Sequence, residues 1–174
     1  MSIRISLTAL ALIAHAAVTA VAQTRPDFSG RWTVEPAPTS ANAQRNGDMG
    51  SGWGSTITMT QTSAALTLEW PYYTRGDLQP PLVFVYPLDG SEKTNTLMMG
   101  RGLEKQVSRT AWNGDKLVIT TTQAFSDLVP GQTVMTTVVR TLSLQSPTSM
   151  LVETTRSGVL GGRPSTTQTV YKKS

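Results

Sequence analysis

Apolar and polar side chains alternate with a period of two along nearly all of this chain after Phe28. Ile57 and Met59 alternate with threonines, and Leu117 and Ile119 alternate with a lysine, a valine and a threonine. These segments are rich in Thr, Val, Trp and Tyr, which favour half-buried strands. We find no amphipathic helical pattern between Phe28 and the C-terminus, so the sequence predicts an all-β fold.

Turn residues separate the alternating segments. Asn113-Gly114 has the composition of a two-residue hairpin turn, because both residues tolerate a positive φ. We expect strands at residues 28–35, 55–62, 65–70, 82–87, 93–99, 104–112, 116–123, 132–144, 149–157 and 165–173. The segments 36–54 and 71–81 are rich in Gly or Pro and are expected to be loops. Consecutive strands with short turns predict an antiparallel up-and-down barrel of about eight to ten strands, or a strongly curved sheet.

The N-terminus has the features of a bacterial export signal. Arg4 supplies a positive charge, an apolar segment follows, and Ala20-Val21-Ala22 matches a signal-peptidase site. The apolar segment is shorter than the roughly 20 residues of a membrane-spanning helix. We therefore expect a signal peptide at residues 1–22, cleaved after Ala22, and one periplasmic or secreted β-barrel domain at residues 23–174.

The chain has no cysteine, and its single histidine, His15, lies in the expected signal peptide. A mature chain without His or Cys lacks the usual general base, thiol nucleophile and zinc ligands. We expect no enzyme, no cofactor and no metal. A hydrolase with paired carboxylates is the alternative enzyme, but Glu69, Glu104 and Glu153 look like solvent-facing strand residues.

The net charge of +4 comes from basic residues spread singly along the chain, with Lys172-Lys173 as an adjacent pair. Nucleic-acid binding requires clustered basic residues, so no nucleic-acid partner is expected. Many predicted strands are shorter than the roughly 9–11 residues of membrane-spanning strands. We therefore expect a protein that does not span a membrane.

Gly30-Arg31-Trp32, at the start of the first strand, resembles the Gly-x-Trp motif of the lipocalin and calycin superfamily. The resemblance implies structural roles for Gly30, which permits a close approach, and for Trp32, which closes one barrel end. It also implies that an arginine from a late strand, Arg140 or Arg156, packs over Trp32.

A closer resemblance extends over nearly all of the mature chain. Residues 27–32, 112–119 and 170–173 are similar to small exported bacterial β-proteins of unknown function that open with Asp-Phe-Ser/Thr-Gly-x-Trp. This resemblance implies the β fold and export, and it supplies no catalytic residues.

Two arginines share strand faces with apolar residues. We expect Arg140, Arg109 and Tyr171 to point into the barrel and to meet an anionic head group, because an unpaired buried arginine costs several kcal/mol. In the alternative interpretation, Arg140 stacks on Trp32 or pairs with Glu69 or Glu153, and Arg109 lies in solvent.

Trp53, Tyr72 and Tyr73 fall in the expected loops and form either an aromatic platform at the barrel mouth or part of the core. The sequence favours an exported, non-enzymatic, lipocalin-like protein that binds a small apolar or amphipathic ligand. The alternative is an envelope structural or interaction protein with a filled barrel and a protein or polysaccharide partner. A ligand-binding barrel needs an interior cavity of about 300 Å³ or more.

Overall fold

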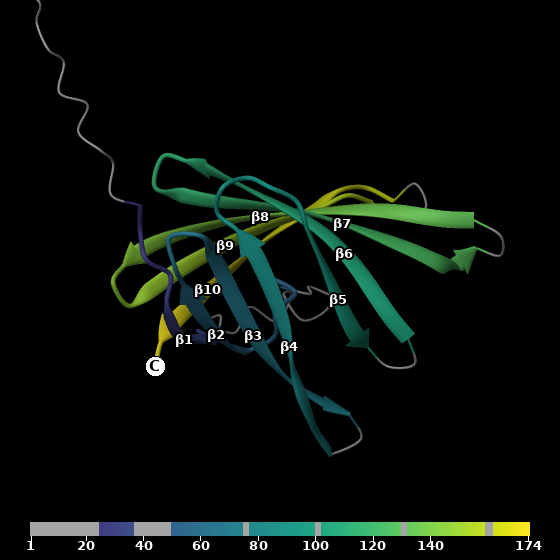
Figure 1. Ribbon diagram of the computed structural model, residues 1–174. Coiled ribbons are helices and arrows are strands. Elements are labelled where there is room, and N and C mark those ends of the chain that lie inside the picture. Colours follow the sequence, from purple (N-terminus) through teal and green to yellow (C-terminus); the bar gives the residue numbers. More distant parts are fainter. Residues whose placement is uncertain (1–24, 37–49, 75–76, 100–101, 130–131, 159–161) are drawn as a thin grey trace, which may run out of the picture.

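The computed structural model describes residues 25–36, 50–74, 77–99, 102–129, 132–158 and 162–174. Within these residues the fold consists of antiparallel strands without a helix, as predicted (Figure 1). The strands are β1 (Gly30–Val34), β2 (Thr56–Gln61), β3 (Ala65–Thr74), β4 (Asp77–Pro87), β5 (Lys93–Met99), β6 (Gly102–Asn113), β7 (Lys116–Val129), β8 (Gln132–Ser146), β9 (Ser149–Arg156) and β10 (Ser165–Lys173). The expected signal peptide lies outside the described residues.

The strands form one curved sheet in the order β4-β3-β2-β1-β10-β9-β8-β7-β6-β5. Strands adjacent in the sequence are therefore neighbours, except β4 and β5, and β1 also pairs with β10, with Trp32 opposite Lys173. The sheet curves into a nearly closed barrel whose two edges, β4 and β5, are consecutive in the chain (Figure 1). The prediction of an up-and-down antiparallel barrel is confirmed.

Among the described residues, the side chain of Asn95 bridges the seam between the edge strands β4 and β5, and Thr110 on β6 donates to the Pro87 carbonyl of β4. The side-chain Oδ1 of Asn95 accepts from the Val85 amide at 2.8 Å, and its Nδ2 donates to the Val85 carbonyl at 3.2 Å. The Asn95 amide thus takes the place of a strand partner for one residue of β4. This bridge reduces the number of backbone N–H and C=O groups that lack a hydrogen-bond partner on the edge strands. Such unpaired groups favour aggregation of open sheets.

Two segments differ from the sequence prediction. Of the segment 71–81, expected to be a loop, residues 71–74 belong to β3 and residues 77–81 to β4, and their pairing continues beyond a register shift between Trp70 and Tyr72. The prolines there are tolerated because proline is accepted at bulges and on strand edges without a ladder partner, and β4 is an edge strand. The turn between β6 and β7 also sits one residue later than expected. Asn113 pairs with Lys116, and Gly114, with φ 64°, is the first central residue.

The barrel is filled at the end that carries the β6–β7 and β8–β9 turns. Trp32 is fully buried there, and the Lys173 ammonium lies 5.3 Å from its ring centroid. Gly30 permits this contact, because a Cβ at its φ of 139° would collide with the Lys173 side chain. The expectation that Arg140 or Arg156 covers Trp32 is therefore wrong: the pairing of β1 with β10 places Lys173 beside it.

The described residues include no helix of the length and apolarity that a membrane span requires.

Candidate functional site

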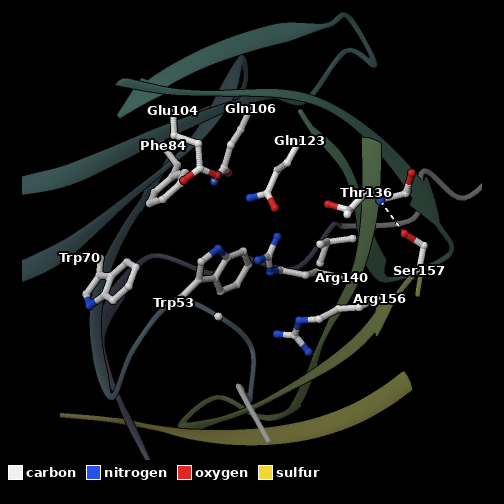
Figure 2. Close-up of a pocket in the computed structure, with 13 residues that line it drawn as sticks. Trp53, Trp70, Phe84, Glu104, Gln106, Gln123, Thr136, Arg140, Arg156 and Ser157 are labelled. Carbon is white, nitrogen blue, oxygen red and sulfur yellow. Dashed lines mark hydrogen bonds between the residues drawn. The ribbon is translucent and has the colours of Figure 1, made fainter. Parts of the chain in front are cut away.

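The other end of the barrel holds a cavity of ≈ 330 Å³. Its wall is formed by side chains from β3, β4, β6, β7, β8 and β9, together with residues that precede β2 (Figure 2). Glu104 and Thr136 near the starts of β6 and β8, and Ser157 just after β9, place it at the end where β5–β6, β7–β8 and β9–β10 connect. The barrel thus has a filled end and a hollow end.

Residues 50–54, which we call the inner segment, enter the barrel beside this cavity. Ser51 and Trp53 are almost completely buried. Two arginines hold the segment by its backbone: Arg140 Nε donates to the Ser51 carbonyl at 2.7 Å, and Arg156 Nη2 donates to the Gly50 carbonyl at 2.6 Å.

Tyr171 holds the inner segment from β10. Its hydroxyl donates to the Gly54 carbonyl at 2.9 Å and lies 2.5 Å from Ser51 Oγ. Burial raises the pKa of Tyr171, while the Ser51 hydrogen bond and the charge of Arg140 oppose the rise. The phenol is therefore neutral at ordinary pH and is committed to fixing the inner segment.

Glycine is required at two positions of the inner segment. Gly52 and Gly54 have φ of 77° and 78°, a region that L side chains rarely adopt. A Cβ on Gly52 would lie 3.0 Å from Arg140 Nη2, and one on Gly54 would overlap the Trp70 indole. The glycines therefore let the segment lie against the residues that line the cavity.

Arg140 is the central charged group of the site. Its side chain is 6% exposed, and its guanidinium carbon lies 4.9 Å from the Trp53 ring centroid. Burial lowers the pKa of the guanidinium, and the nearby charge of Arg156 lowers it further. Within the described residues, no carboxylate pairs with Arg140, and its two terminal nitrogens make no hydrogen bond.

Aromatic rings form the apolar side of the cavity. Trp53, Trp70 and Phe84 all line it. The buried Trp53 Nε1 has no hydrogen-bond partner, although it faces the Tyr86 hydroxyl. This N–H is therefore directed at the protein's own Tyr86 and, being buried, is not presented to the cavity.

The opposite side of the cavity is polar. Gln106 on β6, Gln123 on β7 and Thr136 on β8 are paired across the sheet in register, and we call them the polar row. Glu104 lies two positions before Gln106 on β6, and its Oε1 accepts a hydrogen bond from Gln106 Nε2 at 2.9 Å. Figure 2 shows these side chains directed into the same space as Arg140.

Two of the three residues expected at an anion site lie inside the barrel. Arg140 and Tyr171 are buried, but Arg109 is outside, 63% exposed and 3.0 Å from Glu92. The inward face of β6 is the polar one that contains Gln106, so the exposed Val107 shares the outer face with Arg109. The assignment of Arg109 to the interior is therefore wrong.

The aromatic residues also differ from the prediction. Trp53 is 1% exposed and stands within the barrel, so it does not form an exposed platform. Tyr72 and Tyr73 belong to β3, and their side chains lie outside the described residues. Among the carboxylates, Glu69 and Glu153 are exposed as expected, whereas Glu104 lines the cavity.

The polar row was not predicted as part of a site. Its sequence signal was present, because Glu104, Gln106, Ser108 and Thr110 alternate with period two along β6. A polar face normally indicates solvent, and two apolar residues on the other face strengthened that interpretation. The pattern of one strand therefore pointed to the wrong face.

The sequence matches no protein-family model, and no curated protein is significantly similar to it. The function must therefore be inferred from the site itself. Chemically, the site offers a buried cation, aromatic surfaces and a polar wall. This combination suits a small molecule with an acid group and an apolar body.

Proposed function

We propose that this protein is an exported, non-enzymatic, lipocalin-like protein that binds a small amphipathic acid inside its barrel. The observation that carries the proposal is the buried Arg140 guanidinium, which faces the cavity without a carboxylate partner among the described residues. In this proposal Arg140 holds the acid group, and Trp53 and Phe84 contact the apolar body.

The energetic argument concerns the buried charge of Arg140. Removing an unpaired ion from water costs several kcal/mol, so a buried arginine needs compensation. The Ser51 carbonyl and the Trp53 ring supply part of it. A ligand carboxylate would supply the rest through charge-assisted hydrogen bonds to the terminal nitrogens. Fixed aromatic rings around the charge add apolar contact at little entropic cost.

The cavity volume supports a binder over the alternative of a filled barrel. Ligand pockets commonly have volumes of about 300–1,000 Å³, and the cavity of ≈ 330 Å³ lies at the small end of this range. It fits a compact molecule. In an interaction protein without a ligand, Arg140 would serve only to hold the inner segment through Ser51 and Trp53.

Residue chemistry supports binding without catalysis. After signal removal the chain would contain no His or Cys. Glycoside hydrolysis with two carboxylates requires an acidic pair across the substrate. Among the described cavity residues, Glu104 is the one carboxylate. The remaining polar groups are amides, hydroxyls and guanidiniums, which bind and orient but do not commonly transfer protons near neutral pH.

Native mass spectrometry of residues 23–174, purified gently from the host's envelope fraction, tests this proposal. We expect a stoichiometric small acid that is released on denaturation. The Arg140→Met variant should lose this mass, because lost hydrogen bonds to a charged group weaken binding about ten- to a hundredfold. Arg109→Met is the matched control, since Arg109 lies outside the barrel and should not affect the ligand.

A ligand-free wild-type protein would contradict the proposal and favour the envelope interaction protein. A ligand that stays bound to Arg140→Met as tightly as to wild type would remove Arg140 from the site.

A further inference from the structure

We infer that the ligand carries hydrogen-bond donors at the end opposite its acid group, with an ammonium or hydroxyl group near Glu104. The inference rests on the proposed function and narrows its ligand class. It excludes simple fatty acids as preferred ligands and favours amino or hydroxy acids whose two polar ends are separated by a short apolar chain.

The first argument is the excess of hydrogen-bonding groups on the cavity wall. The polar row contributes two amides and a hydroxyl to a space that a purely apolar chain would have to fill. A buried polar group left without a partner costs about 1–3 kcal/mol. An alkyl chain packed against the polar row would therefore lose affinity that a hydrogen-bonding ligand keeps.

The second argument is the chemistry of Glu104. A carboxylate accepts hydrogen bonds and donates none. Gln106 occupies one of its oxygens, and the group stands among the residues that line the cavity. A ligand donor is the natural complement of the remaining acceptor capacity, and a cationic donor makes the stronger bond.

The third argument is the separation of the two charged groups. Arg140 is in register with Ile119 and, through it, with Thr110 on β6. Glu104 lies six positions from Thr110 on the same strand, which is roughly 20 Å along the sheet at about 3.3 Å per residue. Two long side chains shorten this distance, so a chain of several carbons fits between the two groups.

The strand register also predicts how the ligand is oriented in the cavity. Glu104 lies near the start of β6, toward the β5–β6 connection, whereas Arg140 lies deeper in the barrel. The acid group therefore enters first and reaches Arg140. The donor end stays near the connections at the hollow end.

Isothermal titration of residues 23–174 with three probes tests the inference. Hexanoate, 6-hydroxyhexanoate and 6-aminohexanoate have the same acid and chain and differ in the terminal group. We expect 6-aminohexanoate to bind the wild type at least about tenfold more tightly than hexanoate, as a charge-assisted hydrogen bond implies. The hydroxy acid should bind with intermediate affinity.

Variants assign the effect to Glu104. In Glu104→Gln, the advantage of 6-aminohexanoate over hexanoate should fall to a fewfold or less. The circular dichroism spectrum and the urea transition of this variant, compared with those of the wild type, report that it is folded. Glu153→Gln is the matched control, because Glu153 is exposed on β9 and should leave all three affinities unchanged.

The outcomes separate the two proposals. If hexanoate binds as tightly as 6-aminohexanoate, the inference fails and the proposed function stands. If the amino acid keeps its full advantage in Glu104→Gln, the role of Glu104 is wrong. If none of the three probes binds the wild type at millimolar concentration, both proposals fail.

Discussion

At the scale of single residues, the site depends on its glycines, which have no side chain, as much as on its large side chains. Gly54 lets the inner segment turn with a φ of 78° while its α-carbon lies against the Trp70 indole. A side chain there would meet both a backbone penalty and a steric one. Trp53 and Ser51 reach their buried positions only because their glycine neighbours accept this path.

We predict that Gly54→Ala destabilises the protein by about 2–4 kcal/mol, the sum of a left-handed backbone cost and an overpacking cost. Urea denaturation measures the effect. Gly90→Ala is the matched control, because Gly90 has a similar φ of 85° but an added Cβ there would lie at an ordinary 3.5 Å from the Thr110 carbonyl oxygen. It should cost about 1–2 kcal/mol. Equal losses of stability in the two variants would show that the Trp70 side chain moves away from the added Cβ without an energetic cost.

The buried phenol of Tyr86 predicts that the stability of the protein depends on pH and in which direction it changes. Burial raises the pKa of its phenol above the ordinary value of 10.0, and the charge of Arg140 opposes the rise. Above pH 10.0 the unfolded chain loses a proton that the folded chain keeps, so stability falls as pH rises. Below that pH the phenol is neutral in both states and contributes no slope.

We therefore predict that Tyr86→Phe flattens the loss of stability above pH 10.0. The free energy of unfolding, measured by urea titration at several pH values, provides the comparison. Parallel curves for the wild type and the variant would show that Tyr86 does not titrate differently in the two states.

At the scale of strands, the barrel is weakest where β4 meets β5. These edges lack a ladder, and the Asn95 amide serves the Val85 N–H and C=O in its place. Apart from this amide and the Thr110 hydroxyl, which donates to the Pro87 carbonyl, the described residues join these edges by side-chain packing. Access to the cavity through this side would require no break in a continuous ladder.

We predict that Asn95→Ala costs about 1–3 kcal/mol, because it leaves part-buried polar groups of Val85 unpaired. Hydrogen exchange should accelerate in β4 and β5 more than in β7 and β8. Thr94→Ala, on the exposed neighbouring position, should have little effect. Uniform acceleration over the whole sheet would instead indicate global destabilisation.

For strand β6, the side-chain pattern of the single strand does not identify the face that points into the barrel. Its period of two is clear, and its two faces were separated correctly. The choice of the inner face failed because Val107 and Arg109 alternate with the side chains of Gln106 and Ser108, and apolar content favoured the wrong set. Which face of a strand is buried depends on the neighbouring strands and on the space that they enclose. The sequence of a single strand does not carry this information.

At the scale of the whole molecule, the strand order is circular apart from one seam. β1 pairs with both β2 and β10, so the first and last strands are joined within the sheet. The Ser174 amide also donates to the Arg31 carbonyl at 3.0 Å. The chain could therefore be closed at its termini and opened elsewhere without a change in strand order.

We predict that a circular permutant opened at Gly90, in the β4–β5 turn, keeps the fold and loses less stability than one opened at Gly114. Opening at Gly90 separates two edges that share no ladder, whereas opening at Gly114 lengthens the closure between β6 and β7, which are paired. Urea transitions with an unchanged m-value would identify native-like permutants. The reverse order of stability would show that the seam is a structural requirement.

The sequence by itself determined the ten strands, most of their bounds and the antiparallel neighbours, because alternation and turn residues act over a few positions. It also identified Arg140 as an inward residue, since its strand has one clearly apolar face, and it placed Tyr171 inward on a face shared with Thr167 and Thr169. Tertiary structure decided the rest: the inward face of β6, the extension of β3 and β4 through the prolines, and the entry of Trp53 into the barrel. Each of these depends on closure of the sheet, which brings distant strands around one interior and gives a buried place to groups that look solvent-facing in the sequence.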